Sequence, residues 1–248
     1  MVKRCLVSEI GGAPFLDDGL QTSSLATLAC AVRQRNAGNA RPLNDYLQPS
    51  VARQCYLHTH AQPIPELPST ELAADNVESI QATCQRIVKI MPIWRGLFSL
   101  PIAWKLLGSD LISSSNPLIP QYIFLGRRAF NGPQPLEEII IHELSHIWVA
   151  MIAEVAPLAA PTGPIYTLPS GTSGKNAVQI LYAATFATAV VRYFRACVSS
   201  GNASDQEIAR LKRRESYAAG CLDIISDSNQ LLEDGRFLAA SCKRILES

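Results

Sequence analysis

Apolar residues recur three and four positions apart in several long segments of the chain, the spacing that gives a helix one buried face. Proline separates these segments: Pro92 follows one of them, and Pro135 and Pro157 bracket another. Ser69 or Thr70 can cap the start of the segment that Pro92 ends. The pattern predicts helices over residues 23–35, 70–91, 136–155, 176–198, 204–226 and 233–246.

Two shorter apolar runs, residues 102–107 and 122–125, have the length and flanking residues of β-strands. Residues 108–117 between them are polar, and we expect a loop there. The fold class that follows is mainly α (α+β): a helical domain with a small β-hairpin or sheet before the helix at 136–155.

We expect one catalytic domain over residues 1–248, because a chain of this length is near the upper size for a single hydrophobic core. Within it, residues 1–65 form an irregular N-terminal segment and residues 66–248 a helical core. Residues 156–175 are rich in proline, glycine, serine and threonine, which predicts a long loop. Such a loop can be a lid or binding loop, or a surface connection without a role.

Composition excludes several classes of protein. Charged residues make up 17% of the chain and the net charge is +1, so there is no basic surface for nucleic acid. The seven cysteines are spread singly along the chain, a pattern that indicates free thiols in a reducing cytoplasm. No signal peptide is evident, and the uncharged run at 176–191 is shorter than the roughly 20 residues that span a bilayer. We therefore expect a cytoplasmic protein that binds neither membranes nor nucleic acid.

The sharpest chemical signal is the run His142-Glu143-Leu144-Ser145-His146. Residues four apart lie on one face of a helix, so both imidazoles can bind one metal ion. Glu143 lies roughly 60–100° around the helix from each of them, where its carboxylate can accept a proton beside the ion. The motif predicts a divalent metal site with a neighbouring base.

The residues around this motif are apolar, and no other charge occurs from Ile139 to Ala153. Burying a polar group without a partner costs on the order of 2–7 kcal/mol, so a bound metal ion would satisfy the imidazoles at low cost. The alternative is a half-buried helix whose histidines bond backbone carbonyls.

A catalytic metal usually has a third protein ligand, and no histidine follows His146. Glu154 lies roughly 12 Å further along the same helix, too far to reach the ion. Glu207 and Glu215 lie on a later predicted helix and could fold back. Glu207 can instead belong to a capping box with Ser204, and Glu215 can pair with a lysine on the surface.

The order of segments from about residue 115 to 246 resembles the HExxH-type 2-oxoglutarate-dependent peptide β-hydroxylases. The similar parts are the strand-like run Tyr-Ile-Phe-Leu-Gly, the HExxH helix, the proline-rich loop, an apolar helix and a closing Leu-Leu-Glu-Asp-Gly-Arg run. The resemblance implies an Fe(II) enzyme that hydroxylates a side chain of a peptide or an amino-acid-derived natural product.

This chain departs from that family at two positions. A third histidine of the family corresponds to Tyr182, which the resemblance places at the active site and which otherwise is an ordinary core aromatic residue. The family carries arginine in the preceding loop, suited to a carboxylate of 2-oxoglutarate, where this chain offers Lys175.

Three hypotheses follow, in this order. The first is an Fe(II) oxygenase, in which 2-oxoglutarate is the possible co-substrate and Tyr182 or a water completes the metal site. The second is a Zn(II)-dependent hydrolase or metallopeptidase with Glu143 as general base and Glu207 or Glu215 as third ligand. The third is a partner-binding protein that keeps a degenerate metal helix. The substrate could be a peptide or a small molecule, and the oligomeric state is open.

Overall fold

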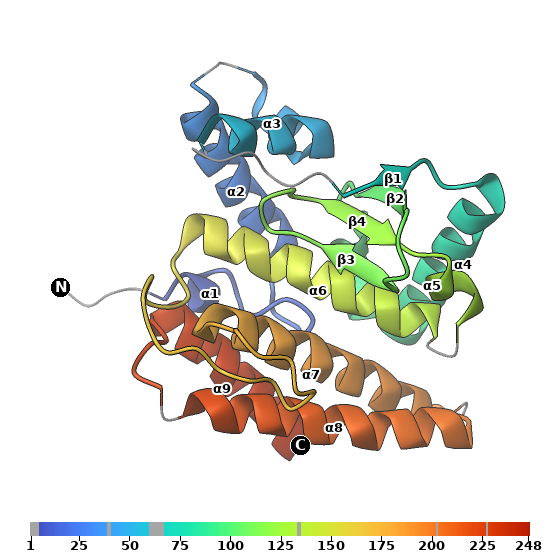
Figure 1. The fold of residues 1–248 in the computed structure, drawn as a ribbon. Helices are drawn as coiled ribbons and strands as arrows, with labels where there is room; N and C mark the ends of the chain where they lie inside the picture. The colour runs from blue at the N-terminus through green and yellow to red at the C-terminus, as the bar shows by residue number, and fades with distance from the viewer. Residues whose placement is uncertain (1–4, 39–40, 60–66, 133–134, 202, 227) are drawn as a thin grey trace. The chain divides into compact units, whose positions relative to one another are not determined.

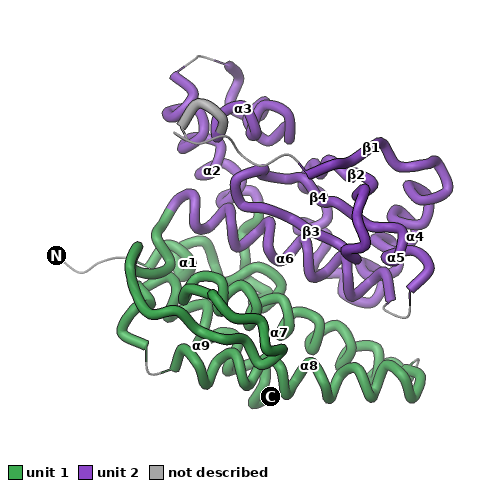
Figure 2. The backbone as a smooth tube through the Cα atoms, in the orientation of Figure 1, with its two compact units in different colours: residues 1–22, 156–248 green, residues 23–155 purple. Residues whose placement is uncertain are grey.

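The computed structural model describes residues 5–38, 41–59, 67–132, 135–201, 203–226 and 228–248 (Figure 1). The chain divides into two compact units (Figure 2). Unit 1 comprises Met1–Thr22 and Ala156–Ser248, and unit 2 comprises Ser23–Val155. The positions of the two units relative to one another are not determined, so each is described by itself.

Unit 2 holds a sheet of four short strands in the order β1-β2-β4-β3. These are β1 (Ser69–Thr70), β2 (Ala103–Leu107), β3 (Ser113–Ser115) and β4 (Tyr122–Leu125). Strands β2 and β4 run parallel, whereas β1 and β3 pair antiparallel at the two edges. The strands expected at 102–107 and 122–125 are confirmed as β2 and β4.

The loop expected at 108–117 is partly wrong, because β3 lies within it. Ser113, Ser114 and Ser115 pair with Leu125, Phe124 and Ile123 of β4. Three serines lack the apolar alternation that marks a strand in sequence, and it is the pairing with β4 that makes them one.

Helices surround this sheet in unit 2 (Figure 1). Helix α6 (Leu136–Val155) carries the HExxH motif, and its bounds agree with the prediction. The others are α2 (Thr22–Ala37, whose first residue falls in unit 1), η1 (Leu43–Leu47), α3 (Pro49–Thr59), α4 (Ala74–Ile90), η2 (Pro92–Ser99) and α5 (Arg128–Asn131).

Helix α4 begins later than predicted. Ser69 and Thr70 pair with Leu107 and Leu106 in the sheet, so they are not available as helix caps. The residue at the cap position is Ala73, which has no side-chain bond to the helix.

A buried ion pair ties α6 to α2 inside unit 2. The Arg33 side chain is 1% exposed and donates two hydrogen bonds of 2.8 Å to the carboxylate of Glu154, near the end of α6. It also donates to the carbonyl oxygen of Tyr46 at 2.9 Å and to the side-chain oxygen of Gln121. The Gln121 amide in turn donates to the carbonyl oxygens of Leu47 and Pro101. Such a satisfied network holds the elements that it joins in one arrangement.

Unit 1 is helical. Its long apolar helix α7 begins with a capping box, in which the Asn176 side chain accepts from the backbone of Gln179 and Gln179 accepts from the backbone of Asn176. Ser204 and Glu207 form the capping box that was predicted for α8. The helices of this unit are α1 (Leu6–Glu9), α7 (Ala177–Ser199), α8 (Asp205–Ser226) and α9 (Glu233–Glu247).

By length and composition, helix α7 could cross a membrane, but 78% of its most apolar 18-residue stretch is buried inside the protein. Core helices of soluble proteins meet the same criteria. The predicted buried helix at 176–198 is therefore present, with nearly the expected bounds.

The fold class is confirmed: 62% of the chain is helical and 8% is strand, with one small mixed sheet. Residues 1–65 differ from the irregular segment that was expected. Their described part forms α1, α2, η1 and α3, of which the sequence pattern indicated only α2.

Candidate metal centre

His142 and His146 lie one turn apart on α6 and turn their rings toward each other. Their Nε2 atoms are 2.8 Å apart, and the ring planes meet at 77° with centroids 4.5 Å apart. Both side chains are half-buried. The separation of four residues thus brings the two Nε2 atoms together, as the motif predicts.

The pKa of His146 is lowered from 6.5 to about 3. Burial is the main cause, the neighbouring His142 lowers the pKa further, and the negative charge of Glu143 acts against both. The ring is therefore neutral at physiological pH, which is the form that binds a metal ion.

Glu143 is fixed by the β3 strand. Glu143 is only 3% exposed, and each of its carboxylate oxygens accepts one short hydrogen bond. The Ser113 hydroxyl donates to Oε1 at 2.6 Å and the Ser115 hydroxyl donates to Oε2 at 2.6 Å. Residues two apart on a strand share a face, so alternate serines can hold both oxygens at once. The carboxylate consequently has a defined orientation beside the histidine pair.

A glycine at the end of β4 permits this approach of β3. The Gly126 N–H donates to the carbonyl oxygen of Ile112 at 2.8 Å. A Cβ atom on Gly126 would lie 1.9 Å from the carbonyl oxygen of Leu111, so any side chain there would push the β3 segment away.

The rest of the motif is packed in an apolar environment. Ile140, Ile141 and Leu144 are buried, and the Trp148 indole N–H donates to the carbonyl oxygen of Leu97 at 3.0 Å. The buried Ser145 hydroxyl has no hydrogen-bond partner among the residues that the structure describes. Helix α6 is thus anchored on both sides of the histidines, which limits how far the rings can move.

Tyr182 and Lys175 belong to unit 1, whereas the motif belongs to unit 2. Tyr182 is half-buried on α7. Lys175 is half-buried before α7, and its backbone pairs with that of Tyr166 at 2.7 and 3.0 Å. Because the two units are not placed relative to one another, the proximity of these residues to the histidines stays a prediction.

The two glutamates considered as third ligands have other partners inside unit 1. Glu207 accepts hydrogen bonds from the backbone and hydroxyl of Ser204 at 2.7 Å, as a capping residue does. Glu215 accepts from the guanidinium of Arg195 at 2.8 and 3.0 Å, rather than from a lysine. These contacts involve one oxygen of each carboxylate, Oε2 of Glu207 and Oε1 of Glu215, so a role of either residue as third ligand stays a prediction.

Across the described part of the chain, no group of three or more histidine, cysteine, aspartate or glutamate side chains converges as a metal site would require. The histidine pair is accordingly the observed part of the candidate centre. Sequence reasoning missed Ser113 and Ser115, and the only available signal was their alternate spacing within a polar run.

No family model matches the chain, and no curated protein matches it significantly.

Proposed function

We propose that this protein is a metal-dependent enzyme whose ion is held by His142 and His146. Fe(II) is the favoured ion, and the reaction is hydroxylation of a peptide or an amino-acid-derived substrate. The observation that carries the proposal is the convergence of the two Nε2 atoms to 2.8 Å on a buried helix. The seven free thiols support a reducing, cytoplasmic environment, in which Fe(II) is stable.

His142 and His146 would hold the ion through their Nε2 atoms, and the two rings would have to separate slightly to do so. Two nitrogens about 2.1 Å from a common ion are about 3.0 Å apart at a right angle and about 3.4 Å apart in a tetrahedron. From 2.8 Å the rings must separate by roughly 0.2 Å for the first geometry and roughly 0.6 Å for the second. The same 2.8 Å suits a ring N–H···N hydrogen bond, the contact that the pair makes without an ion.

Glu143 would act as a fixed negative charge beside the ion. Ser113 and Ser115 each occupy one lone pair of the carboxylate, so it is oriented and partly satisfied before a substrate arrives. Each oxygen keeps lone-pair capacity, so Glu143 can also accept a proton from a substrate or water. Fe(II), when bound, would supply the oxygen chemistry of hydroxylation.

The resemblance to the HExxH-type peptide β-hydroxylases supports 2-oxoglutarate as co-substrate. Lys175 would pair with one of its carboxylates, and Tyr182 would stand where that family has its third histidine. His142 and His146 would hold the ion, and the keto acid would bind it beside them.

A Zn(II)-dependent hydrolase is the second candidate, and the position of Glu143 favours it. An oriented, buried carboxylate next to a metal ion is what general-base attack of water on a peptide bond requires. Both candidates need the same three residues, so the ion and the reaction must distinguish them.

Metal content tests the shared part of the proposal. The protein is purified anaerobically, reconstituted with Fe(II) or Zn(II), and analysed for bound metal beside His142→Ala and a matched control, His58→Ala, outside the motif. We expect about one ion per chain in the parent and in the control, and loss of that ion in His142→Ala. Equal metal content in all three would overturn the metal site and leave a partner-binding protein.

Two activity assays then separate the candidates. Consumption of 2-oxoglutarate by the Fe(II) form, together with a mass increase of one oxygen in a peptide pool, supports the hydroxylase. Cleavage of the pool by the Zn(II) form, abolished in Glu143→Gln, supports the hydrolase instead. A Tyr182→His variant with higher Fe(II) affinity would place residue 182 in the coordination sphere; unchanged affinity would assign Tyr182 to the core.

A further inference from the structure

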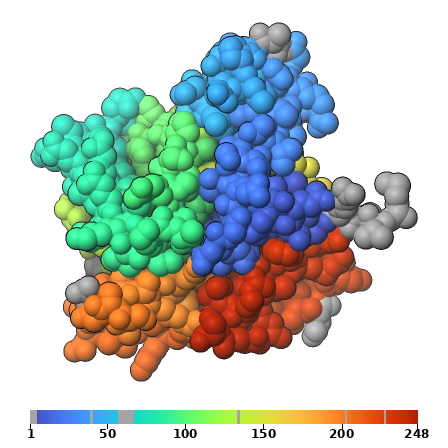
Figure 3. All heavy atoms as spheres, turned by 180° about the vertical axis from the view of Figure 1, so that it is seen from behind, coloured from blue at the N-terminus to red at the C-terminus, as the bar shows by residue number. Residues whose placement is uncertain are grey.

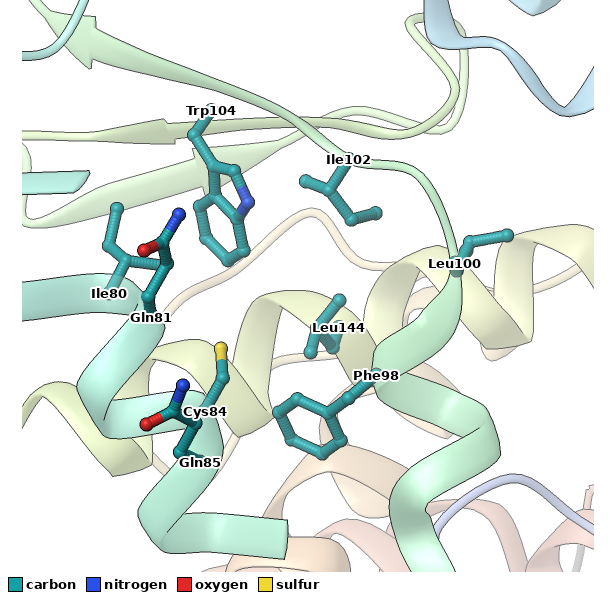
Figure 4. A pocket seen from close by; sticks show the side chains of 9 residues that line it. All are labelled: Ile80, Gln81, Cys84, Gln85, Phe98, Leu100, Ile102, Trp104 and Leu144. Atoms are coloured by element: carbon teal, nitrogen blue, oxygen red, sulfur yellow. The ribbon is translucent and has the colours of Figure 1, made fainter. Parts of the chain in front are cut away.

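Helix α4 and the 3₁₀ segment η2 border a groove in unit 2 that the proposed reaction does not use. Its inner part is a cavity of about 300 Å³ (Figure 4). Side chains from α4, η2, β2 and α6 meet there, and most are apolar: Ile80, Phe98, Leu100, Ile102, Trp104 and Leu144. The size falls at the lower end of the range for small-molecule sites, about 300–1,000 Å³.

This cavity lies away from the metal centre. Leu144 is the residue of α6 that lines it, and Leu144 is two positions from each histidine. At about 100° per residue, it therefore points to the opposite side of α6 from His142 and His146. A molecule in the cavity would contact the back of the site helix and not the ion.

A second, more open cavity of about 540 Å³ adjoins the first, and the two share Cys84, Gln85 and Phe98 as lining residues. Atoms of α4 and η2 lie side by side at the surface in the view of Figure 3, where they are teal and green. Together the two cavities form one groove, apolar at its inner end and open to solvent at its outer end.

The outer end of the groove is positively charged. Lys89 and Arg95 line it, both are exposed, and neither forms an ion pair with a described residue. Arg86 on the same helix is instead paired with Glu137. No acidic side chain lines either cavity in the described structure. The groove thus presents two cations without an ion-pair partner among the described residues at its outer end, beside an inner part in which most of the lining residues are apolar.

We propose that this groove binds a long-chain fatty acid, with the hydrocarbon chain against Trp104, Phe98 and Leu144 and the carboxylate near Lys89 and Arg95. An anionic head complements the two cations, and an apolar tail needs no hydrogen bonds inside. A peptide would bring backbone N–H and C=O groups into a cavity whose polar side-chain groups are Gln81, Gln85, the Cys84 thiol and the Trp104 indole N–H. Those groups would be left largely unsatisfied, which disfavours a peptide occupant.

Binding is measured with the full chain and cis-parinaric acid, whose fluorescence rises in an apolar site, with palmitate as competitor. We expect saturable binding that palmitate displaces and that hexadecylamine, with the same chain and a cationic head, displaces at least roughly tenfold less well. The double variant Lys89→Glu/Arg95→Glu should bind about tenfold more weakly, because two attractions become repulsions. The matched control Lys212→Glu/Arg213→Glu, on the exposed surface of α8, should bind as the parent does.

A second measurement does not depend on charge. Cys84 and Cys5 are the two partly exposed cysteines, and burial raises the pKa of both thiols, that of Cys84 to about 11. Palmitate should slow alkylation of Cys84 several-fold, as followed by peptide mass spectrometry, and leave Cys5 unchanged. The rim variant Gln85→Trp, which adds bulk where the two cavities meet, should weaken parinaric acid binding without lowering the melting temperature.

The inference is independent of the metal centre, so His142→Ala should bind parinaric acid as the parent does. It is wrong if palmitate neither displaces the probe nor protects Cys84. It is also wrong if palmitate and hexadecylamine compete equally, or if an acidic amphipathic peptide displaces the probe at a lower concentration than palmitate.

Discussion

Replacing the two serines that hold Glu143 offers the most direct test of the candidate site, because its outcome does not depend on the ion or the substrate. In the structure, Ser113 and Ser115 each donate one hydrogen bond of 2.6 Å to a carboxylate that is almost fully buried. Ser113→Ala or Ser115→Ala removes one donor and leaves one carboxylate oxygen without its partner.

The magnitude follows from the charge and burial of Glu143. A hydrogen bond to a charged group contributes about 1.5–3 kcal/mol to stability. Because Glu143 is only 3% exposed, water has little access to replace a lost serine hydroxyl. Each single substitution should therefore lower the free energy of unfolding by about 1.5–3 kcal/mol. The double substitution should cost more than either single one, although the two effects need not add, because both serines bond the same carboxylate. A water admitted into the space of a lost hydroxyl would bring the values to the lower end.

Tryptophan fluorescence during urea unfolding is a suitable assay. The three tryptophans of the chain, Trp94, Trp104 and Trp148, all lie in unit 2, so their signal reports the unit that contains the site. A double-mutant cycle adds specificity. Ser113→Ala should cost about 1 kcal/mol less in a Glu143→Gln background, because the bond to a neutral amide is weaker than the bond to a carboxylate.

Ser114 is the matched control. It lies between the two serines, and its side chain points to the other face of β3. Ser114→Ala should change the free energy of unfolding by less than about 0.5 kcal/mol. If Ser114→Ala were as costly as its neighbours, or if Ser113→Ala and Ser115→Ala were both neutral, the idea that β3 orients Glu143 would be refuted.

Three further outcomes are expected. Arg33→Met should lower the free energy of unfolding by about 3–5 kcal/mol in the same fluorescence assay, because it leaves a buried carboxylate unpaired. The control Lys243→Met, at an exposed ion pair, should change this free energy by less than about 0.5 kcal/mol. Burial raises the pKa of Cys221 from 9.0 to about 12 and that of Cys242 from 9.0 to about 11. The thiols of the unfolded chain therefore ionise first, and stability is lost as the pH rises above 9.0. The loss is up to about 1.4 kcal/mol per pH unit for each thiol. Calorimetric melting should show a shallower loss in Cys221→Ala/Cys242→Ala, and an equally steep loss would contradict the assignment. Gly126→Ala should destabilise unit 2 by about 1–3 kcal/mol, because the added Cβ atom clashes with a facing carbonyl. Urea unfolding measures this loss, and a neutral result would mean that the β3 segment moves aside easily.

The long helices were accessible from the sequence because their signals are local. The predicted helix at 136–155 has the bounds of α6, since Pro135 and Pro157 bracket it and apolar residues fill its length. The capping box of Ser204 and Glu207 was legible for the same reason: its two residues are three positions apart. The spacing of His142 and His146 likewise implied that their rings meet.

The elements that sequence reasoning missed depend on partners far along the chain. Ser69 and Thr70 read as helix caps, but pairing with β2 outweighs that local preference and moves the start of α4 to Ala74. The short helices α1 and α3 carry little periodicity in sequence, and in the structure they contact α9 and η1, respectively.

The sequence by itself determined that the imidazoles of His142 and His146 lie side by side, because a helix places positions i and i+4 on one face whatever surrounds it. Only the tertiary structure decided how Glu143 is held, because its two partners lie 28 and 30 residues away on a strand that exists through pairing with β4. Hydrogen bonds between distant segments depend on the path of the whole chain, and a local pattern contains no information about that path.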